Sequence, residues 1–186
     1  MKGVVLVILS LAFLGCRTVT VSRVSSVVSV DYDRSMDDWT KAGKYKRYEG
    51  NNQENVDLNN FKSEKTGKAE LEMRLMCFKG VTTLSKVMKK FNRFGFGPAN
   101  LQELFAYLEK YPKTSGGRVV EALGSIWVER GGERRSPAVW GSPESPDSFL
   151  KTRMLGIEWL GIGEYGDGLI DESAFFENSC FVAIPK

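Results

Sequence analysis

Any catalysis by this chain must rely on carboxylates, lysine or tyrosine, because the sequence of 186 residues contains no histidine. The absence of histidine excludes Ser-His-Asp and Cys-His nucleophilic catalysis, histidine general bases and histidine-ligated metal sites. Carboxylates gather among glycines in the segment EWLGIGEYGDGLIDE, at Glu158, Glu164, Asp167, Asp171 and Glu172. Glu158 with Glu164 or Asp171 could form the carboxylate pair of a glycosidase, if about 5–10 Å separates the two groups in a cleft.

The same acidic segment lacks the spacing of an EF-hand calcium loop. When Gly168 is placed at the sixth position of such a loop, Gly163 falls at the first. Tyr165 then falls at the third position and Ala174 at the twelfth, so the required oxygen ligands are missing. Acidic, glycine-rich loops are ordinarily solvated turns. We therefore expect no metal and no other cofactor, and we favour a protein without catalysis over a carboxylate-dependent hydrolase.

The N-terminal segment MKGVVLVILSLAFLGCRT has the layout of a secretory signal peptide. Lys2 precedes an apolar run from Val4 to Leu14, which is shorter than the roughly 20 residues that a transmembrane helix needs. A charged start, an apolar core of about 7–15 residues and a small residue at the end are typical of export signals. The sequence therefore predicts export, with residues 1–15 as the signal peptide.

The end of this segment, Phe13-Leu14-Gly15-Cys16, resembles the lipobox of bacterial lipoproteins. It departs from that pattern at Phe13, where leucine is usual. The resemblance implies diacylation of the Cys16 thiol, cleavage before Cys16 and acylation of the new amino group, so that fatty acids such as palmitate hold the protein on a bilayer. Arg17, in place of an aspartate, favours the outer membrane if the cell has two membranes. The alternative is an ordinary signal peptide with a chance cysteine at its end.

Two further cysteines, Cys77 and Cys180, remain if Cys16 carries lipid. Two thiols are too few for a structural zinc site. In an exported protein they could form one disulfide, or both could be small buried hydrophobic residues in strands. The sequence leaves these two alternatives open.

The elements that position these residues are expected to form one α+β domain over residues 27–186, after a lipidated tether at 16–26. We expect two or three helices on a small, mostly antiparallel sheet and a C-terminal half rich in loops. Ser35 is a candidate N-cap for a short helix, with Asp37 and Asp38 in its first turn. Residues 27–30 and the alternating segment AELEMRLMCF predict strands, whereas the polar residues 49–68 predict a loop.

Two amphipathic helices are predicted after the second strand. Apolar residues recur at helical spacing over 81–93, while the opposite side carries lysines and an arginine, which we interpret as a solvated face. Asn100 followed by Glu103 predicts a capping box at the start of the next helix. We expect a tight Gly-Pro turn to join the two helices and both to pack on the sheet.

The order of these segments resembles a family of small, functionally uncharacterised bacterial proteins. The resemblance covers residues 28–186 and implies no activity. Its most specific runs are PANLQEL and ALGSIW. The succession of helices and then short strands is also similar to the C-type-lectin and formylglycine-generating-enzyme fold, which implies a binding surface made of long loops. The calcium motifs of the lectins, Glu-Pro-Asn and Trp-Asn-Asp, are absent from the sequence, so the resemblance implies no calcium-dependent sugar binding.

Aromatic residues and arginines gather in the C-terminal half of the chain, where we expect loops to form a binding surface. Trp127 and Trp159 lie within strand-like runs and are expected in the core. The candidate ligand-binding residues are Arg134, Arg135, Trp140, Tyr165 and Phe176.

Together these patterns indicate a membrane-anchored lipoprotein of the bacterial cell envelope with a non-catalytic ligand-binding domain. The alternatives are a carboxylate-dependent envelope hydrolase and a purely structural envelope component. The expected partners are a lipid bilayer, through acylated Cys16, and an envelope polymer or protein ligand. Nucleic acid is not expected, because the formal net charge is only +3 and the basic residues are scattered.

Overall fold

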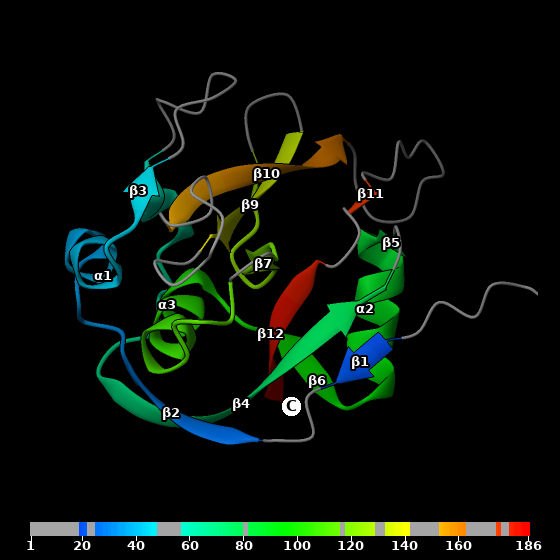
Figure 1. Cartoon of the computed structure of the whole chain (residues 1–186), viewed down its shortest axis with the longest axis horizontal. Helices are drawn as coiled ribbons and strands as arrows, with labels where there is room; N and C mark the ends of the chain where they lie inside the picture. Colours follow the sequence, from blue (N-terminus) through cyan, green and yellow to red (C-terminus); the bar gives the residue numbers. More distant parts are fainter. Residues whose placement is uncertain are drawn as a thin grey trace, which may run out of the picture.

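The structure, a computed structural model, describes residues 19–21, 25–47, 57–79, 82–115, 118–128, 133–141, 153–162, 174–175 and 179–186. In this part of the chain, three α-helices pack on a ten-stranded sheet (Figure 1). The α+β class expected from the sequence is therefore confirmed. The helices are α1 (Met36–Gly43), α2 (Leu84–Arg93) and α3 (Leu101–Lys110), with a short 3₁₀ helix, η2 (Leu58–Phe61).

The sheet has the strand order β1-β4-β12-β7-β9-β10-β3, and β2, β6 and β8 pair with β4, β12 and β9 beside this path. Its described strand pairs are antiparallel except β12 with β7 and β10 with β3. A separate small ladder joins β5 (Thr82–Thr83) and β11 (Ala174–Phe175). The strands of the large sheet are β1 (Val19–Val21), β2 (Ser26–Asp31), β3 (Lys46–Arg47), β4 (Lys68–Phe78), β6 (Phe96–Pro98), β7 (Val120–Glu121), β8 (Trp127–Val128), β9 (Glu133–Trp140), β10 (Met154–Ile162) and β12 (Cys180–Pro185).

The central strand β12 is buried on both faces. Because successive side chains of a strand point to opposite faces, Cys180 and Val182 lie in the core under α1 and α3. Phe181 and Ala183 lie in a second core under α2. Helices α2 and α3 therefore cover opposite faces of the sheet, on either side of β4 and β12 (Figure 1).

This arrangement corrects the expected connection between the two helices. A tight turn cannot carry the chain from one face of a sheet to the other. The connection instead contains strand β6, which pairs with β12 and so belongs to the sheet itself. The chain therefore passes through the layer of the sheet on its way from α2 to α3. Helix α2 also begins later than the predicted residue 81, because residues 82 and 83 pair with β11.

Local signals near the N-terminus of the domain behave as predicted. The Ser35 hydroxyl accepts a hydrogen bond of 3.1 Å from the backbone N–H of Asp38, which caps α1. The predicted strands at 27–30 and 69–78 are β2 and β4, which pair with each other. Within the expected loop, residues 58–61 form the 3₁₀ helix η2.

Part of the expected tether belongs to the sheet. Val19–Val21 forms β1 and pairs with Met76–Phe78 of β4. The alternating Val-Thr-Val sequence suits a strand, and β4 offers an open edge there. The signal peptide and Cys16 lie outside the described residues. No helix in the described part of the chain is long and apolar enough to cross a bilayer.

Cys77 of β4 and Cys180 of β12 lie directly opposite each other and are joined by a disulfide bond. In the next pair of residues, the backbone N–H of Phe78 donates to the carbonyl oxygen of Ser179 at 3.0 Å. Hydrogen-bonded and non-hydrogen-bonded pairs alternate along an antiparallel ladder. The two cysteines therefore occupy a non-hydrogen-bonded pair, where side chains of adjacent strands come closest.

The first prediction concerns this disulfide. Replacing both residues, Cys77→Ala with Cys180→Ala, should lower the free energy of unfolding by about 4 kcal/mol. The bond joins residues 103 positions apart, so losing it returns a large conformational entropy to the unfolded chain. Urea unfolding measures the change, and reductant should bring the native sequence to the stability of the variant. Two titratable thiols at these positions in denatured, non-reduced protein would contradict the bond.

Candidate functional site

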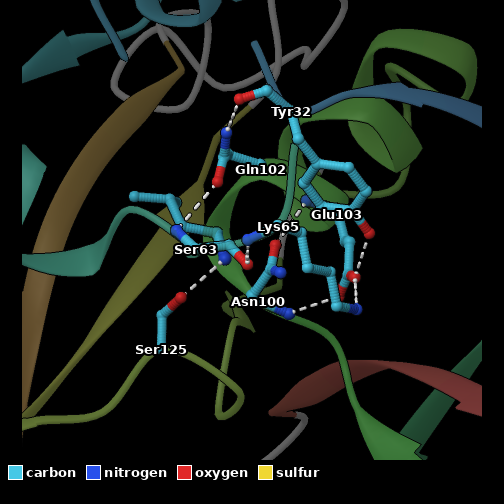
Figure 2. Close-up of polar contacts among 8 residues, drawn as sticks. Tyr32, Ser63, Lys65, Asn100, Gln102, Glu103 and Ser125 are labelled. Atoms are coloured by element: carbon cyan, nitrogen blue, oxygen red, sulfur yellow. Dashed lines mark hydrogen bonds and ion pairs between the residues drawn. The ribbon is translucent and has the colours of Figure 1, made fainter. Parts of the chain in front are cut away.

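A buried carboxylate organises a polar site at the start of α3 (Figure 2). Glu103 is only 1% exposed. Its Oε1 atom accepts hydrogen bonds from the Tyr32 hydroxyl at 2.5 Å and from Lys65 Nζ at 2.9 Å. Its Oε2 atom accepts a hydrogen bond of 2.7 Å from the backbone N–H of Asn100. Three donors from separate segments of the chain thus converge on one carboxylate.

The local sequence explains one of these donors. Asn100 and Glu103 form the capping box predicted from their spacing, because the Asn100 Oδ1 atom also accepts from the Glu103 N–H at 2.9 Å. A negative charge in the first turn is also favoured by the helix dipole. Tyr32 and Lys65 lie 71 and 38 residues before Glu103, and no sequence spacing indicates that they join the cap.

Two more polar side chains join neighbouring segments to the first turn of α3. Gln102 is fully buried; its Nε2 atom donates to the carbonyl oxygen of Tyr32, and its Oε1 atom accepts from the Ser63 N–H, both at 2.9 Å. The Ser125 hydroxyl accepts from the Leu101 N–H at 2.9 Å and donates to the carbonyl oxygen of Phe61 at 3.0 Å. The segments after β2, after η2 and after β7 are therefore held together at one helix terminus.

These segments enclose a polar cleft of about 310 Å³. We call it the α3 cleft. Glu103 and Asn100 line its inner part, and the exposed side chains of Lys62 and Lys65 lie at its opening. Ile126, 36% exposed, adds an apolar group to the rim.

One wall of the α3 cleft depends on a glycine. The Gly124 N–H donates to the carbonyl oxygen of Ala99 at 2.9 Å. A Cβ atom at position 124 would lie 2.7 Å from backbone atoms of Pro98 and Ala99. Only glycine permits this close approach of two backbones, so the wall formed by residues 124–126 sits directly against the chain that enters α3.

The protonation of Tyr32 supports its role as a donor. Burial raises the pKa of its hydroxyl well above the usual value, and the hydrogen bond to Glu103 and the charge of that carboxylate raise it further. Tyr32 is therefore neutral at physiological pH and donates to Glu103. A general base needs a carboxylate oxygen that faces its substrate, whereas both Glu103 oxygens already accept hydrogen bonds from the protein. The arrangement suits binding better than proton transfer.

The structure separates the residues that the sequence suggested for ligand binding. Arg134, Arg135 and Trp140 belong to strand β9 and are half-buried, so they are not loop residues as expected. Arg135 and Trp140 are five residue steps apart along the extended strand, which span about 17 Å, so these two do not form one compact patch. Tyr165 and Phe176 lie outside the described residues.

Arg135 is connected to the α3 cleft through two aromatic residues, Trp127 and Phe61. It is directly opposite Trp127 of β8, so the two side chains share a face of the sheet. Trp127 is half-buried and makes an edge-to-face contact with Phe61, which lines the cleft; the ring centroids are 6.3 Å apart. Trp127 thus packs against the core, as expected. The side chain of Trp159 is not among those that the structure describes.

The candidate carboxylate pair of a hydrolase also falls outside what the structure describes. Glu158 lies in β10, but its side chain is not among the described ones, and Glu164 and Asp171 lie in the undescribed segment 163–173. Among the described residues, no group of three or more cysteines and carboxylates is arranged to hold a metal ion.

No family model, curated protein or solved structure matches the chain. These comparisons therefore support neither the resemblance to a small bacterial family nor the resemblance to the C-type-lectin fold.

The second prediction concerns the buried carboxylate. Tyr32→Phe should lower the free energy of unfolding by about 1–3 kcal/mol, because it removes a hydrogen bond to a buried charge. Tyr111→Phe is the matched control, because the Tyr111 hydroxyl donates to the neutral hydroxyl of Ser26 at 2.6 Å and not to a buried carboxylate. Urea unfolding at neutral pH measures both variants, and an equal effect of the two would contradict the role assigned to Tyr32.

Proposed function

We propose that the protein is a membrane-anchored lipoprotein of the bacterial cell envelope whose α+β domain binds a polar ligand without transforming it. The anchor is inferred from the lipobox-like sequence that ends at Cys16. The binding activity is inferred from the α3 cleft. Each part has its own test.

The observation that carries the binding proposal is the preorganised lining of the cleft. Its inner groups are held by hydrogen bonds to the first turn of α3, through Glu103, Gln102 and Ser125. Groups that are already ordered lose little conformational entropy when a ligand arrives. A cleft with a fixed polar lining is therefore suited to recognition.

The charges of the cleft indicate the chemistry of its ligand. Three charged residues line it, and the carboxylate of Glu103 is already engaged by Lys65 and by neutral donors. The ammonium group of Lys62 adds a second positive charge at the opening. Asparagines and serines add amide and hydroxyl groups to the lining, so we propose a polar ligand with a negative charge, such as a fragment of an envelope polymer.

The engaged carboxylate also favours a binding protein over a hydrolase at this cleft. A hydrolase that uses the carboxylates of the segment 158–172 remains the alternative, and a structural component of the envelope is the third. Turnover of a bound ligand is the property that separates the first two.

The third prediction tests the anchor. Cys16→Ser should leave the precursor uncleaved by the lipoprotein signal peptidase, because the peptidase acts on an acylated cysteine. The native sequence should incorporate labelled palmitate into the mature protein. A soluble native product that begins beyond residue 16 and carries no lipid would refute the anchor.

The fourth prediction tests the cleft with an array of peptidoglycan fragments and anionic oligosaccharides. We expect retention of one class of fragment without turnover. Lys62→Glu should weaken that binding at least about tenfold, because it places a like charge beside the ligand. Lys46→Glu on strand β3, also exposed and outside the cleft, is the control and should bind normally.

Cleavage of the retained fragment would favour the hydrolase. Equal binding by the native protein and the Lys62→Glu variant would place recognition elsewhere.

A further inference from the structure

Strand β1 determines where the lipid anchor leaves the folded domain. Val19 pairs with Phe78 at the end of β4, and three peptide units join it to Cys16. Extended chain spans at most about 3.5 Å per residue, so three peptide units allow the anchor to be at most about 11 Å from Val19. The proposed anchor therefore holds the bilayer close to this end of the sheet.

Helix α2 lies at this same end. Phe78 packs in one apolar cluster with Leu84, Val87 and Phe91, which form the buried side of α2. Figure 1 agrees, since β1 and α2 occupy the same side of the molecule. A bilayer near Cys16 is therefore also near α2.

The outer side of α2 is basic and carries no acidic group. Lys86, Lys89 and Arg93 are exposed and Lys90 is half-buried; we call these four residues the α2 basic face. No aspartate or glutamate occurs anywhere in residues 79–96. None of the four forms an ion pair within the described part of the chain.

Two neighbouring groups extend this surface. Lys186 Nζ donates to Asn92 Oδ1 on α2, at 2.5 Å, and so brings another positive charge to the helix. Phe94, at the end of α2, is 45% exposed. A basic helix face with an exposed aromatic residue at its end suits the polar surface of a membrane.

We propose that the α2 basic face docks on anionic lipid headgroups of the bilayer that holds the acylated Cys16. This inference rests on the proposed lipid anchor, and it adds an orientation that the anchor alone does not give. Basic segments beside a membrane are attracted to anionic lipids, and the attraction falls off within a Debye length. The short link to Cys16 keeps the basic face within reach of the headgroups.

Docking through α2 also orients the ligand site. Helix α3, whose first turn builds the α3 cleft, covers the opposite face of the sheet. With α2 against the headgroups, α3 is directed away from the bilayer. The lipid anchor and the basic face together therefore present the ligand site to the envelope.

The fifth prediction is tested with the full-length mature protein on two kinds of vesicle, phosphatidylcholine alone and phosphatidylcholine with phosphatidylglycerol. Lysine acetylation is followed by mass spectrometry. We expect Lys86 and Lys89 to react about fivefold more slowly on the anionic vesicles. Lys41 of α1 and Lys46 of β3 should react equally on both, because these two elements lie on the side of the molecule away from α2 (Figure 1). Salt at about 1 M, where the Debye length is about 3 Å, should remove the difference.

A charge-reversal pair provides the matched control. Lys90 of the native protein should also react more slowly on the anionic vesicles, and in the variant Lys86→Glu with Lys89→Glu it should lose this protection. In the variant Lys41→Glu with Lys46→Glu, Lys90 should keep it. The four substituted lysines are exposed. Urea unfolding verifies that both variants retain native stability.

Flotation with neutral vesicles separates failure of this proposal from failure of the anchor. It requires the lipid anchor but no anionic headgroup. If the mature native protein does not float with phosphatidylcholine vesicles, the lipoprotein proposal is refuted. If it floats with both kinds of vesicle and Lys86 and Lys89 react equally on each, docking of the α2 basic face is refuted and the anchor stands.

Discussion

Burial of the Glu103 carboxylate is the constraint on which the α3 cleft depends. A charge removed from water is very unfavourable unless hydrogen bonds replace its hydration. The fold supplies them from Tyr32, Lys65 and the backbone of Asn100. Tyr32 and Lys65 come from two other segments of the chain, so satisfying one charge holds both of these segments against the start of α3. The surfaces of these segments then form the α3 cleft as a consequence.

Helices cover both faces of the sheet, and the two covered faces differ. Alternation along β12 places Cys180 and Val182 under α3, and Phe181 and Ala183 under α2. The disulfide joins β12 to β4 at the centre of this arrangement. Because the two helices share one sheet but cover opposite faces, a surface suited to lipid headgroups and a cleft suited to a soluble ligand can coexist without competing.

Structural features could be predicted from the sequence where the interacting residues are close together in the chain. The Ser35 cap, the alternation of β4 and the Asn100 and Glu103 capping box depend on contacts within a few residues, and the structure has all three. The location of the candidate binding residues was not predicted correctly, since Arg134, Arg135 and Trp140 lie in strand β9 and not in loops. Composition identified residue types typical of binding surfaces, but it carries no information about which segment pairs with β9.

The sequence by itself determined the absence of histidine chemistry, the helix caps, the apolar stripes and the lipobox-like run that ends at Cys16. These features depend only on residue types and on short spacings, so they can be inferred without the tertiary structure. Only the tertiary structure decided that Tyr32 and Lys65 meet Glu103, that β1 joins the sheet beside the end of β4, and that α2 and α3 lie on opposite faces. These features depend on strand pairing and on the burial of charge between distant segments, and the free energy of the whole packed chain selects them.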